Sequence, residues 1–322
     1  MSDKRPGLIL NGITGRIGVN QHLRWAISAL LDEGIELDSG ERVAIDPILV
    51  GRNEEKLAAL ADEHNVSRWT TDLDSALSDS GDAVFFDATP TEQRVENTKR
   101  TIAAGKHVYV EKPTAVDMEG AIALYHTARD AGVKHGVVQN YLWLPGMMKL
   151  RRLLDSGFFG RILAVKIDFG YWIFKGDWQR GQRPSWNYRK EDGGGIVLDL
   201  MPHWRYVLEN LFGAVTDVSC LALNQTTERW DEKGRPYAAT ANDAAFATML
   251  IDEELPVHVA TSWGTRVRRD DISVIQVDGV LGSAVVGLYD CWIQPRAASP
   301  APVFNPDPSN RHDFHGDWQR VP

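Results

Sequence analysis

Cysteine is scarce in this chain. Its 322 residues include only Cys220 and Cys291, so no disulfide framework organises the fold, and each thiol is interpreted as a small buried hydrophobe. No apolar run is long enough to span a membrane, and the short polar stretch before Leu8 has no features of a secretory signal. We therefore expect a cytoplasmic protein with no membrane partner.

Runs of basic residues are also missing. Lys and Arg total 35 against 44 Asp and Glu, which gives a net charge of -9, and the basic residues are dispersed. A nucleic-acid-binding face needs clustered positive charge, so we expect no nucleic-acid partner. No spacing of His and Cys is typical of a zinc site, and we predict no metal.

The chain does contain a strand, a glycine turn and a helix at its start. Apolar residues 8–10 lead into glycines at positions 12, 15 and 18, and a helical pattern of apolar residues follows. Such glycines let the backbone approach a pyrophosphate, whose charge is stabilised at the helix N-terminus. A plain tight turn is the alternative, because Thr14 replaces the middle glycine of the common motif. The candidate cofactor contacts here are Gly12, Thr14, Gly15, Arg16 and Ile17.

The residues after the second expected strand, at 47–50, bear on the choice of cofactor. An acidic side chain at this point accepts from the ribose 2′-hydroxyl of NAD, whereas an arginine accommodates the 2′-phosphate of NADP. The sequence has Arg52 and Asn53 and no carboxylate here. We therefore favour NADP, with NAD as the alternative. In a purely structural interpretation, Asn53 caps the next helix and Arg52 is solvated.

Strands and helices alternate through the rest of the first half. Expected strands at 83–88 and 106–110 end in Thr89-Pro90 and Glu111-Lys112-Pro113. Both loops follow the carboxyl ends of parallel strands, where ligands bind in open α/β sheets. The first half is therefore predicted to be an α/β Rossmann dinucleotide-binding domain, residues 1–140.

The second half, residues 141–322, has a different order of secondary-structure elements. After a helix at 145–154, the expected strands at 162–171, 215–223, 244–251, 257–263, 272–278 and 283–288 have almost no crossover helices between them. This pattern predicts an α+β domain with a largely antiparallel open sheet. We expect it to bind the substrate beside the cofactor cleft and to form a homodimer or homotetramer through the sheet.

Tryptophans and charged donors gather in the segment 172–205. Indole faces and guanidinium groups suit a polyhydroxylated ligand, although core or interface packing is an equal alternative for each tryptophan. The candidate substrate contacts are Arg183, Trp186, Tyr188 and Arg189.

A triple glycine, 193–195, precedes Asp199 and His203, which lie one helical turn apart. Because proline is tolerated only in a first turn, Pro202 is expected to place the helix start close to Asp199. The positive helix end then favours an ionised Asp199 and a neutral His203 able to accept a proton. With Lys112 at a strand end, this pair provides what proton transfer beside a hydride-transfer cofactor needs. An ordinary cap and an exposed histidine are the alternative.

Together these residues resemble the glucose-fructose oxidoreductase, inositol dehydrogenase and MocA family, over nearly the whole chain. The resemblance rests on the glycine turn, Thr89-Pro90, Gly105-Lys106-His107 leading into Glu111-Lys112-Pro113, and Gly193–Gly195 with Asp199 and His203. It implies that Lys112 and His203 assist proton transfer at the oxidised hydroxyl and that Asp199 positions the substrate or the imidazole. It also implies that Thr89, Pro90, Glu111 and Lys112 lie along the cofactor.

Three features depart from the family pattern. Thr14 replaces a glycine, Tyr206 stands where an aspartate often follows the family histidine, and the sequence ends at Pro322 without a C-terminal helical stretch that many members carry. We predict an NAD(P)-dependent oxidoreductase acting on a secondary hydroxyl of a sugar, polyol or glycoside. Two alternatives are an oxidoreductive glycosidase that retains its cofactor and a non-catalytic NADP-binding redox sensor.

Overall fold

The computed structural model describes residues 5–173, 184–300 and 312–322. The chain divides into two compact units, Met1–Val138 and Gln139–Pro322. This division falls two residues before the predicted domain boundary. Each unit has its own sheet and its own core, and each is described separately.

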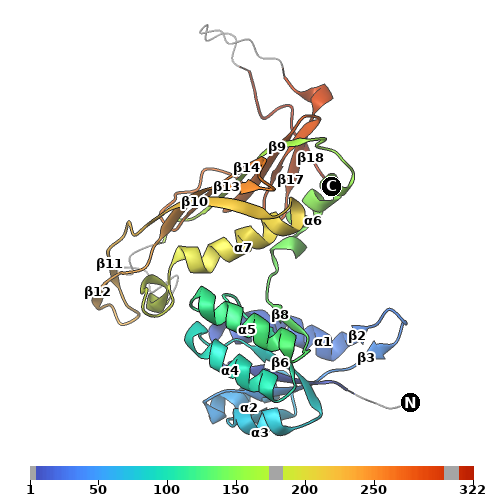
Figure 1. The fold of residues 1–322 in the computed structure, drawn as a ribbon, viewed down its shortest axis with the longest axis vertical. Coiled ribbons are helices and arrows are strands. Elements are labelled where there is room, and N and C mark those ends of the chain that lie inside the picture. Colours follow the sequence, from blue (N-terminus) through green and yellow to red (C-terminus); the bar gives the residue numbers. More distant parts are fainter. Residues whose placement is uncertain (1–4, 174–183, 301–311) are drawn as a thin grey trace. The chain divides into compact units, whose positions relative to one another are not determined.

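The first unit contains a six-stranded parallel sheet (Figure 1). Its strands, in spatial order, are β5 (Arg68–Thr70), β4 (Asp46–Val50), β1 (Gly7–Asn11), β6 (Asp82–Asp87), β7 (His107–Val110) and β8 (His135–Val137). Its helices are η1 (Gly18–Ile27), α1 (Ser28–Glu33), α2 (Glu54–Glu63), α3 (Leu73–Ser78), α4 (Thr91–Ala103) and α5 (Met118–Asp130). The strand order reverses between β1 and β6, as in a Rossmann fold.

Both faces of this sheet are covered. Leu10 and Leu49 pack into one apolar cluster with Leu23 of η1, whereas Ile9 packs into a second cluster with Ile102 of α4. Because helices bury both faces, the central strands consist of almost uninterrupted apolar residues instead of alternating with polar ones. The strand positions predicted from those apolar runs are confirmed to within a few residues.

Two local features of the first unit differ from expectation. The helix after the glycine turn is α-helical at Arg16 and Ile17, continues as a π-helix, η1, and becomes α-helical again at Ser28. Its buried residues, Gly18, Leu23 and Ile27, are spaced by five and four positions, which fits the wider π turn. The polar connection that follows forms a small hairpin of β2 (Ile35–Glu36) and β3 (Arg42–Val43).

The second unit contains an eight-stranded sheet. In spatial order its strands are β10 (Val215–Leu223), β13 (Ala244–Ile251), β14 (Leu255–Ser262), β9 (Ile162–Gly170), β15 (Ser273–Gly279), β16 (Gly282–Val286), β17 (Cys291–Pro295) and β18 (Gln319–Arg320). Only the β14–β9 pair is parallel. The largely antiparallel sheet was predicted, whereas β17 and β18 were not.

The remaining elements of this unit are short except for two helices. They are η2 (Tyr141–Trp143), α6 (Pro145–Asp155), η3 (Ser185–Tyr188), α7 (Ile196–Leu211), η4 (Arg296–Ala298) and a hairpin of β11 (Glu228–Trp230) and β12 (Pro236–Ala238). The helices α6 and α7 lie along one face of the large sheet (Figure 1). Trp204 of α7 is fully buried there with Ile167 of β9 and Val259 of β14.

The start of α7 corrects one prediction. Proline was expected only in a first turn, but α7 begins at Ile196, so Pro202 lies inside the helix. The first turn instead forms against Asn242, whose main-chain oxygen accepts from Ile196 N at 2.9 Å. This partner is 46 residues away in sequence, which is why local helix-start rules misplace the beginning. Asp199 still lies in the first turn, as expected.

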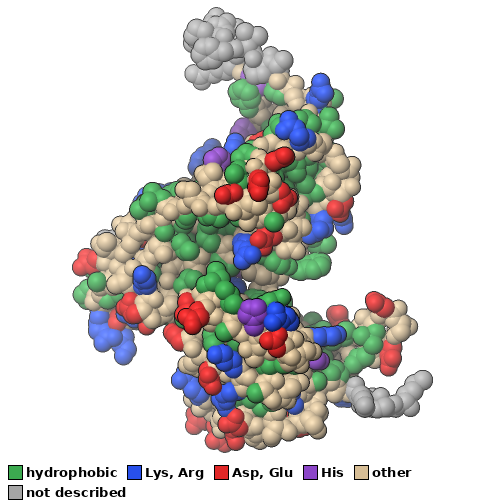
Figure 2. Space-filling view, viewed as in Figure 1, with side chains coloured by type: hydrophobic (Ala, Val, Ile, Leu, Met, Phe, Trp, Pro, Cys, Tyr) green, Lys and Arg blue, Asp and Glu red, His purple; other side chains and the backbone are tan. Residues whose placement is uncertain are grey.

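Charges of both signs are interspersed on the face of the molecule shown in Figure 2. Among the described residues, no helix combines the length and apolar character needed to cross a bilayer. Within the same residues, no three His, Cys, Asp or Glu side chains are grouped so that they could hold a metal ion.

Candidate active site

The glycine turn of the first unit is shaped by close backbone contacts. Gly12 has φ +74°, and a Cβ on it would lie 2.7 Å from Thr89 N at the end of β6. A Cβ on Gly18 would lie 2.8 Å from Ile13 Cα. Only glycine fits these two positions, because a side chain would push the turn away from β6 or the helix away from the turn. The turn therefore lies at the point where the strand order reverses.

This turn fits a dinucleotide pyrophosphate. A Cβ on Gly15 would approach only Gly12 O, at 3.3 Å, so the outer side of the turn is open. Gly15 O accepts from Val19 N, which starts the helix at the turn. Free main-chain N–H groups at such a helix start stabilise phosphate charge. Thr14, in place of the middle glycine, lies against Gly51, whose Cβ would be 3.1 Å from Thr14 Cγ2.

Arg52 and Asn53 follow β4, as predicted. The Asn53 side chain accepts from Lys56 N at 2.8 Å and so caps α2. Asn53 is therefore a helix cap, as the purely structural interpretation of this residue expected. Arg52 is exposed, which leaves its guanidinium accessible to a phosphate but does not by itself distinguish NADP from NAD.

A buried polar cluster that sequence reasoning missed lies beneath the Thr89-Pro90 loop. Asp87 accepts from Asn11 Nδ2 at 3.2 Å, Thr89 N at 3.1 Å and Thr89 Oγ1 at 2.9 Å. Burial raises the pKa of Asp87 despite these hydrogen bonds. Arg94 of α4 is 3% exposed and donates to Thr89 O at 2.6 Å and to Pro113 O. Arg94 therefore links the two loops predicted to line the cofactor.

Glu111 extends this cluster toward Lys112. Its Oε1 lies 2.5 Å from Nε2 of His22 on η1, and its Oε2 accepts from Lys112 N at 3.0 Å. Burial lowers the pKa of Arg94, and the negative charges of Asp87 and Glu111 oppose that shift. The position of Lys112 thus depends on a buried carboxylate. The same contact pairs the His22 imidazole with Glu111.

In the second unit, α7 carries Asp199 and His203. Asn242 Oδ1 accepts from Val197 N at 2.9 Å, in addition to the main-chain bond to Ile196. Two of the four N–H groups that a helix start leaves without intrahelical partners are thereby paired. His203 is the eighth residue of α7, and the helix dipole acts mainly within the first turn. The expectation that the dipole keeps His203 neutral is therefore corrected.

His203 is oriented by its neighbours outside the helix. Its Nδ1 lies 2.8 Å from Oε1 of Gln139. Its ring packs against Tyr141, with the centroids 5.1 Å apart, and Tyr141 in turn packs edge-on against Trp204. Burial raises the pKa of Tyr141 to about 12, with Asp271 and Asp199 adding to the shift and a hydrogen bond to Ser273 opposing it.

The triple glycine brings the 184–188 segment against α7. A Cβ on Gly194 would lie 2.4 Å from Trp186 O, and Gly195 N donates to Asn187 O at 2.9 Å. Trp186 is 45% exposed, which is compatible with its predicted substrate contact. Arg189 packs over the Tyr237 ring and pairs with Asp192.

Tyr188 is corrected as a substrate contact. It is 4% exposed, packs edge-on against Trp263, and lies beneath the Arg229 guanidinium. Its ring belongs to the core of the second unit. Arg183, the remaining predicted contact, lies outside the described residues.

Two family models match most of the chain. Residues 19–139 match the oxidoreductase family with an NAD-binding Rossmann fold, and residues 147–285 match the GFO/IDH/MocA C-terminal domain. The chain belongs to the GFO/IDH/MocA oxidoreductase family. The predicted family and fold class are confirmed, and the protein uses a nicotinamide cofactor.

Individual relatives agree with this membership. A D-xylose dehydrogenase of Paenarthrobacter nicotinovorans is 48% identical over 97% of this chain and 82% of its own length. A 1,5-anhydro-D-fructose reductase of Ensifer adhaerens is 28% identical over 59% of this chain and 53% of its own length. A levoglucosan dehydrogenase solved with NADH and levoglucosan shares the fold, with a TM-score of 0.76 and 22% identity over 98% of this chain and 79% of that one. The predicted nicotinamide-dependent sugar dehydrogenase is confirmed.

Proposed function

We propose that this dehydrogenase oxidises a secondary hydroxyl of an aldose such as D-xylose, with His203 as the proton acceptor. The identity of 48% with a D-xylose dehydrogenase over 97% of the chain carries the choice of substrate. The hydrogen bond at His203 Nδ1 supports the choice of base.

When bound, the nicotinamide accepts a hydride from the carbon of the reacting alcohol. His203 takes the hydroxyl proton at the imidazole, so the O–H bond breaks as an N–H bond forms. The Lys112 ammonium donates a hydrogen bond to the same oxygen and stabilises the charge that develops there. Asp199 positions the substrate or the imidazole. Trp186 and Arg189 are the described residues that we propose as further substrate contacts.

For the cofactor, we propose NADP, with Arg52 holding the 2′-phosphate. Its guanidinium is exposed at the end of β4, where a 2′-phosphate is recognised in this fold. Arg52→Ala is expected to lower the affinity for NADP while leaving that for NAD almost unchanged. Lys56→Ala, which removes an exposed charge from the adjacent helix, is the matched control. An unchanged ratio of the two affinities in Arg52→Ala would contradict this assignment.

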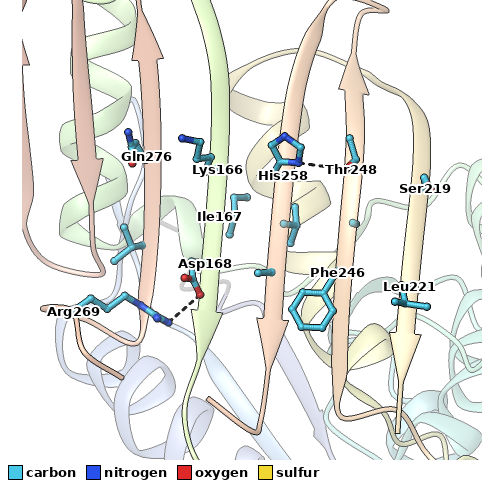
Figure 3. Close-up of a pocket in the computed structure, with 14 residues that line it drawn as sticks. Lys166, Ile167, Asp168, Ser219, Leu221, Phe246, Thr248, His258, Arg269 and Gln276 are labelled. Carbon is cyan, nitrogen blue, oxygen red and sulfur yellow. Dashed lines mark hydrogen bonds and ion pairs between the residues drawn. The ribbon is translucent and has the colours of Figure 1, made fainter. Parts of the chain in front are cut away.

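The face of the large sheet opposite α6 and α7 is proposed as the contact between copies in a homodimer or homotetramer. Figure 3 shows apolar Phe246 and Leu221 on this face, with Lys166 and an Asp168–Arg269 pair on the same face beyond β14. Phe246 and Leu221 are 42% and 59% exposed, and an apolar patch of this kind is typical of an interface. Phe246→Asp is expected to reduce the mass measured by light scattering, whereas an unchanged mass would contradict this contact.

The function is tested by following reduced-nicotinamide absorbance with NADP or NAD and a panel of aldoses, alditols, inositols and glycosides. A signal that is strongest with D-xylose or a close aldose supports the proposal. Turnover of glycosides with release of the aglycone and no net reduction would indicate the glycosidase with a retained cofactor. Cofactor binding without turnover of any compound would indicate the redox sensor.

A further inference from the structure

We infer that Gln139 is a positioning residue that holds His203 in one tautomer and one ring orientation. The inference deepens the proposed function, since it concerns the histidine assigned there as the base. Gln139 lies just beyond β8 and is partly buried, and its Oε1 is 2.8 Å from His203 Nδ1. An amide oxygen only accepts, so Nδ1 must carry the hydrogen. The lone pair of the neutral imidazole is then on Nε2.

The other degrees of freedom of the ring are already restricted. Asn242 holds the start of α7, which fixes the backbone that carries His203. Tyr141 packs on the ring, and Tyr141 is itself held against Trp204. A half-turn of the ring about its Cβ–Cγ bond would keep the packing on Tyr141 but exchange Nδ1 with a carbon. The bond to Gln139 opposes that turn, because it exists in only one of the two orientations.

An amide differs from a carboxylate as a partner for this histidine. A carboxylate would stabilise the imidazolium and make the ring harder to deprotonate, whereas the neutral amide orients the ring without adding charge. The carboxylates that act on the adjacent Tyr141 of η2 include Asp199 on α7 and Asp271 before β15. The amide at position 139 therefore sets the ring orientation without placing a further negative charge beside the imidazole.

The test uses Gln139→Glu and Gln139→Leu in the full-length protein, with Gln319→Glu as a control. Gln319 is exposed on β18 in the same unit, so its substitution adds the same charge away from His203. In Gln139→Glu either rotamer presents an oxygen to Nδ1. The acidic limb of the pH profile for sugar oxidation is expected to move up by about one pH unit, because an adjacent carboxylate stabilises the imidazolium. The control is expected to leave that limb in place.

Gln139→Leu removes the acceptor but preserves much of the side-chain volume. Turnover is expected to fall by about tenfold or more with a smaller change in KM, since the base samples unproductive states. At alkaline pH, Gln139→Glu should keep most of the wild-type turnover that Gln139→Leu loses. A residue that only supports the fold would lower the Tm in both variants without moving the acidic limb or separating kcat from KM. That outcome would overturn the inference.

A second readout does not depend on turnover. In ¹⁵N-histidine-labelled protein without ligands, His203→Asn identifies the His203 signals by their loss, and the imidazole ¹⁵N shifts report which nitrogen carries hydrogen. We expect hydrogen on Nδ1 in the wild type and a tautomer mixture in Gln139→Leu. Identical tautomer signals in the two proteins would contradict the role of Gln139. If the tautomer responds to Gln139 but His203→Asn keeps full activity, the inference stands and the assignment of His203 as the base is wrong.

Discussion

The two units hold their functional residues by different kinds of interaction. In the first, Lys112 follows Glu111, which belongs to a buried cluster of opposite charges with Arg94 and Asp87. In the second, His203 is held by an amide and by aromatic packing against Tyr141. Removing one member of a cluster of buried charges strongly destabilises the fold, because the other charges are left uncompensated. An amide partner, in contrast, adds no charge beside the group that it orients.

The largest effect on cofactor affinity is expected at the glycine turn. Gly12→Ala places a Cβ 2.7 Å from Thr89 N, so we expect the affinity for the cofactor to fall by about tenfold or more, a loss of about 1.4 kcal/mol. Gly105→Ala is the matched control, because its φ of +73° equals that of Gly12 within a degree, yet nothing lies within 4 Å of its added Cβ. Equal losses of affinity in the two variants would show that backbone strain, and not the contact with Thr89, is responsible.

The charged cluster of the first unit predicts a large loss of stability. Arg94→Met removes a buried cation that donates to Thr89 O and Pro113 O and offsets the negative charges of Asp87 and Glu111, so the free energy of unfolding should fall by about 3 kcal/mol or more in urea denaturation. Arg100→Met on the same helix removes a more exposed ion pair with Asp74 and should cost about 1 kcal/mol or less. Similar losses in the two variants would mean that the cluster stabilises the unit no more than a surface pair does.

Two asparagine caps, one in each unit, allow an effect on stability to be distinguished from an effect on kcat. Asn53 caps α2 and Asn242 caps α7, each by accepting a main-chain N–H at 2.8 to 2.9 Å. Replacing either with Ala should cost about 1 kcal/mol of stability. Only Asn242→Ala should also lower kcat, because only α7 carries His203, and Asn242→Asp should restore both. If Asn53→Ala lowers kcat equally, the comparison between the two units fails.

The smallest effect concerns the phenol beside His203. Burial raises the pKa of Tyr141 to about 12, above the ordinary value near 10. The folded state thus holds this proton more tightly than the unfolded state does, so its contribution to stability is complete below pH 10 and declines toward pH 12. Tyr141→Phe should flatten that part of the stability curve in thermal denaturation. An unchanged slope would show that other groups cause it.

Features set by nearby residues could be predicted from the sequence. The apolar runs of β1, β4 and β6 locate the central strands, and the spacing of Gly12, Gly15 and Gly18 locates the turn between a strand and a helix. Asp199 and His203 are one turn apart on any helix that contains both. The resemblance to the family identified the same pair.

Features set by distant partners could not be predicted. The start of α7 depends on Asn242, and the orientation of His203 depends on Gln139, 64 residues earlier. Arg94 looks like one more surface charge on a helical pattern, and only the fold shows that it is buried. One signal was present for Gln139, because it directly follows the apolar residues Val137 and Val138.

The most direct test of the central claim is the rate at which the wild type and His203→Asn form reduced nicotinamide from D-xylose, with cofactor affinity measured in parallel. We predict that turnover falls by about 10² or more in the variant, because general-base catalysis is lost. Cofactor affinity should stay unchanged, since His203 lies in the second unit and the glycine turn in the first. Near-normal turnover by His203→Asn would contradict the account.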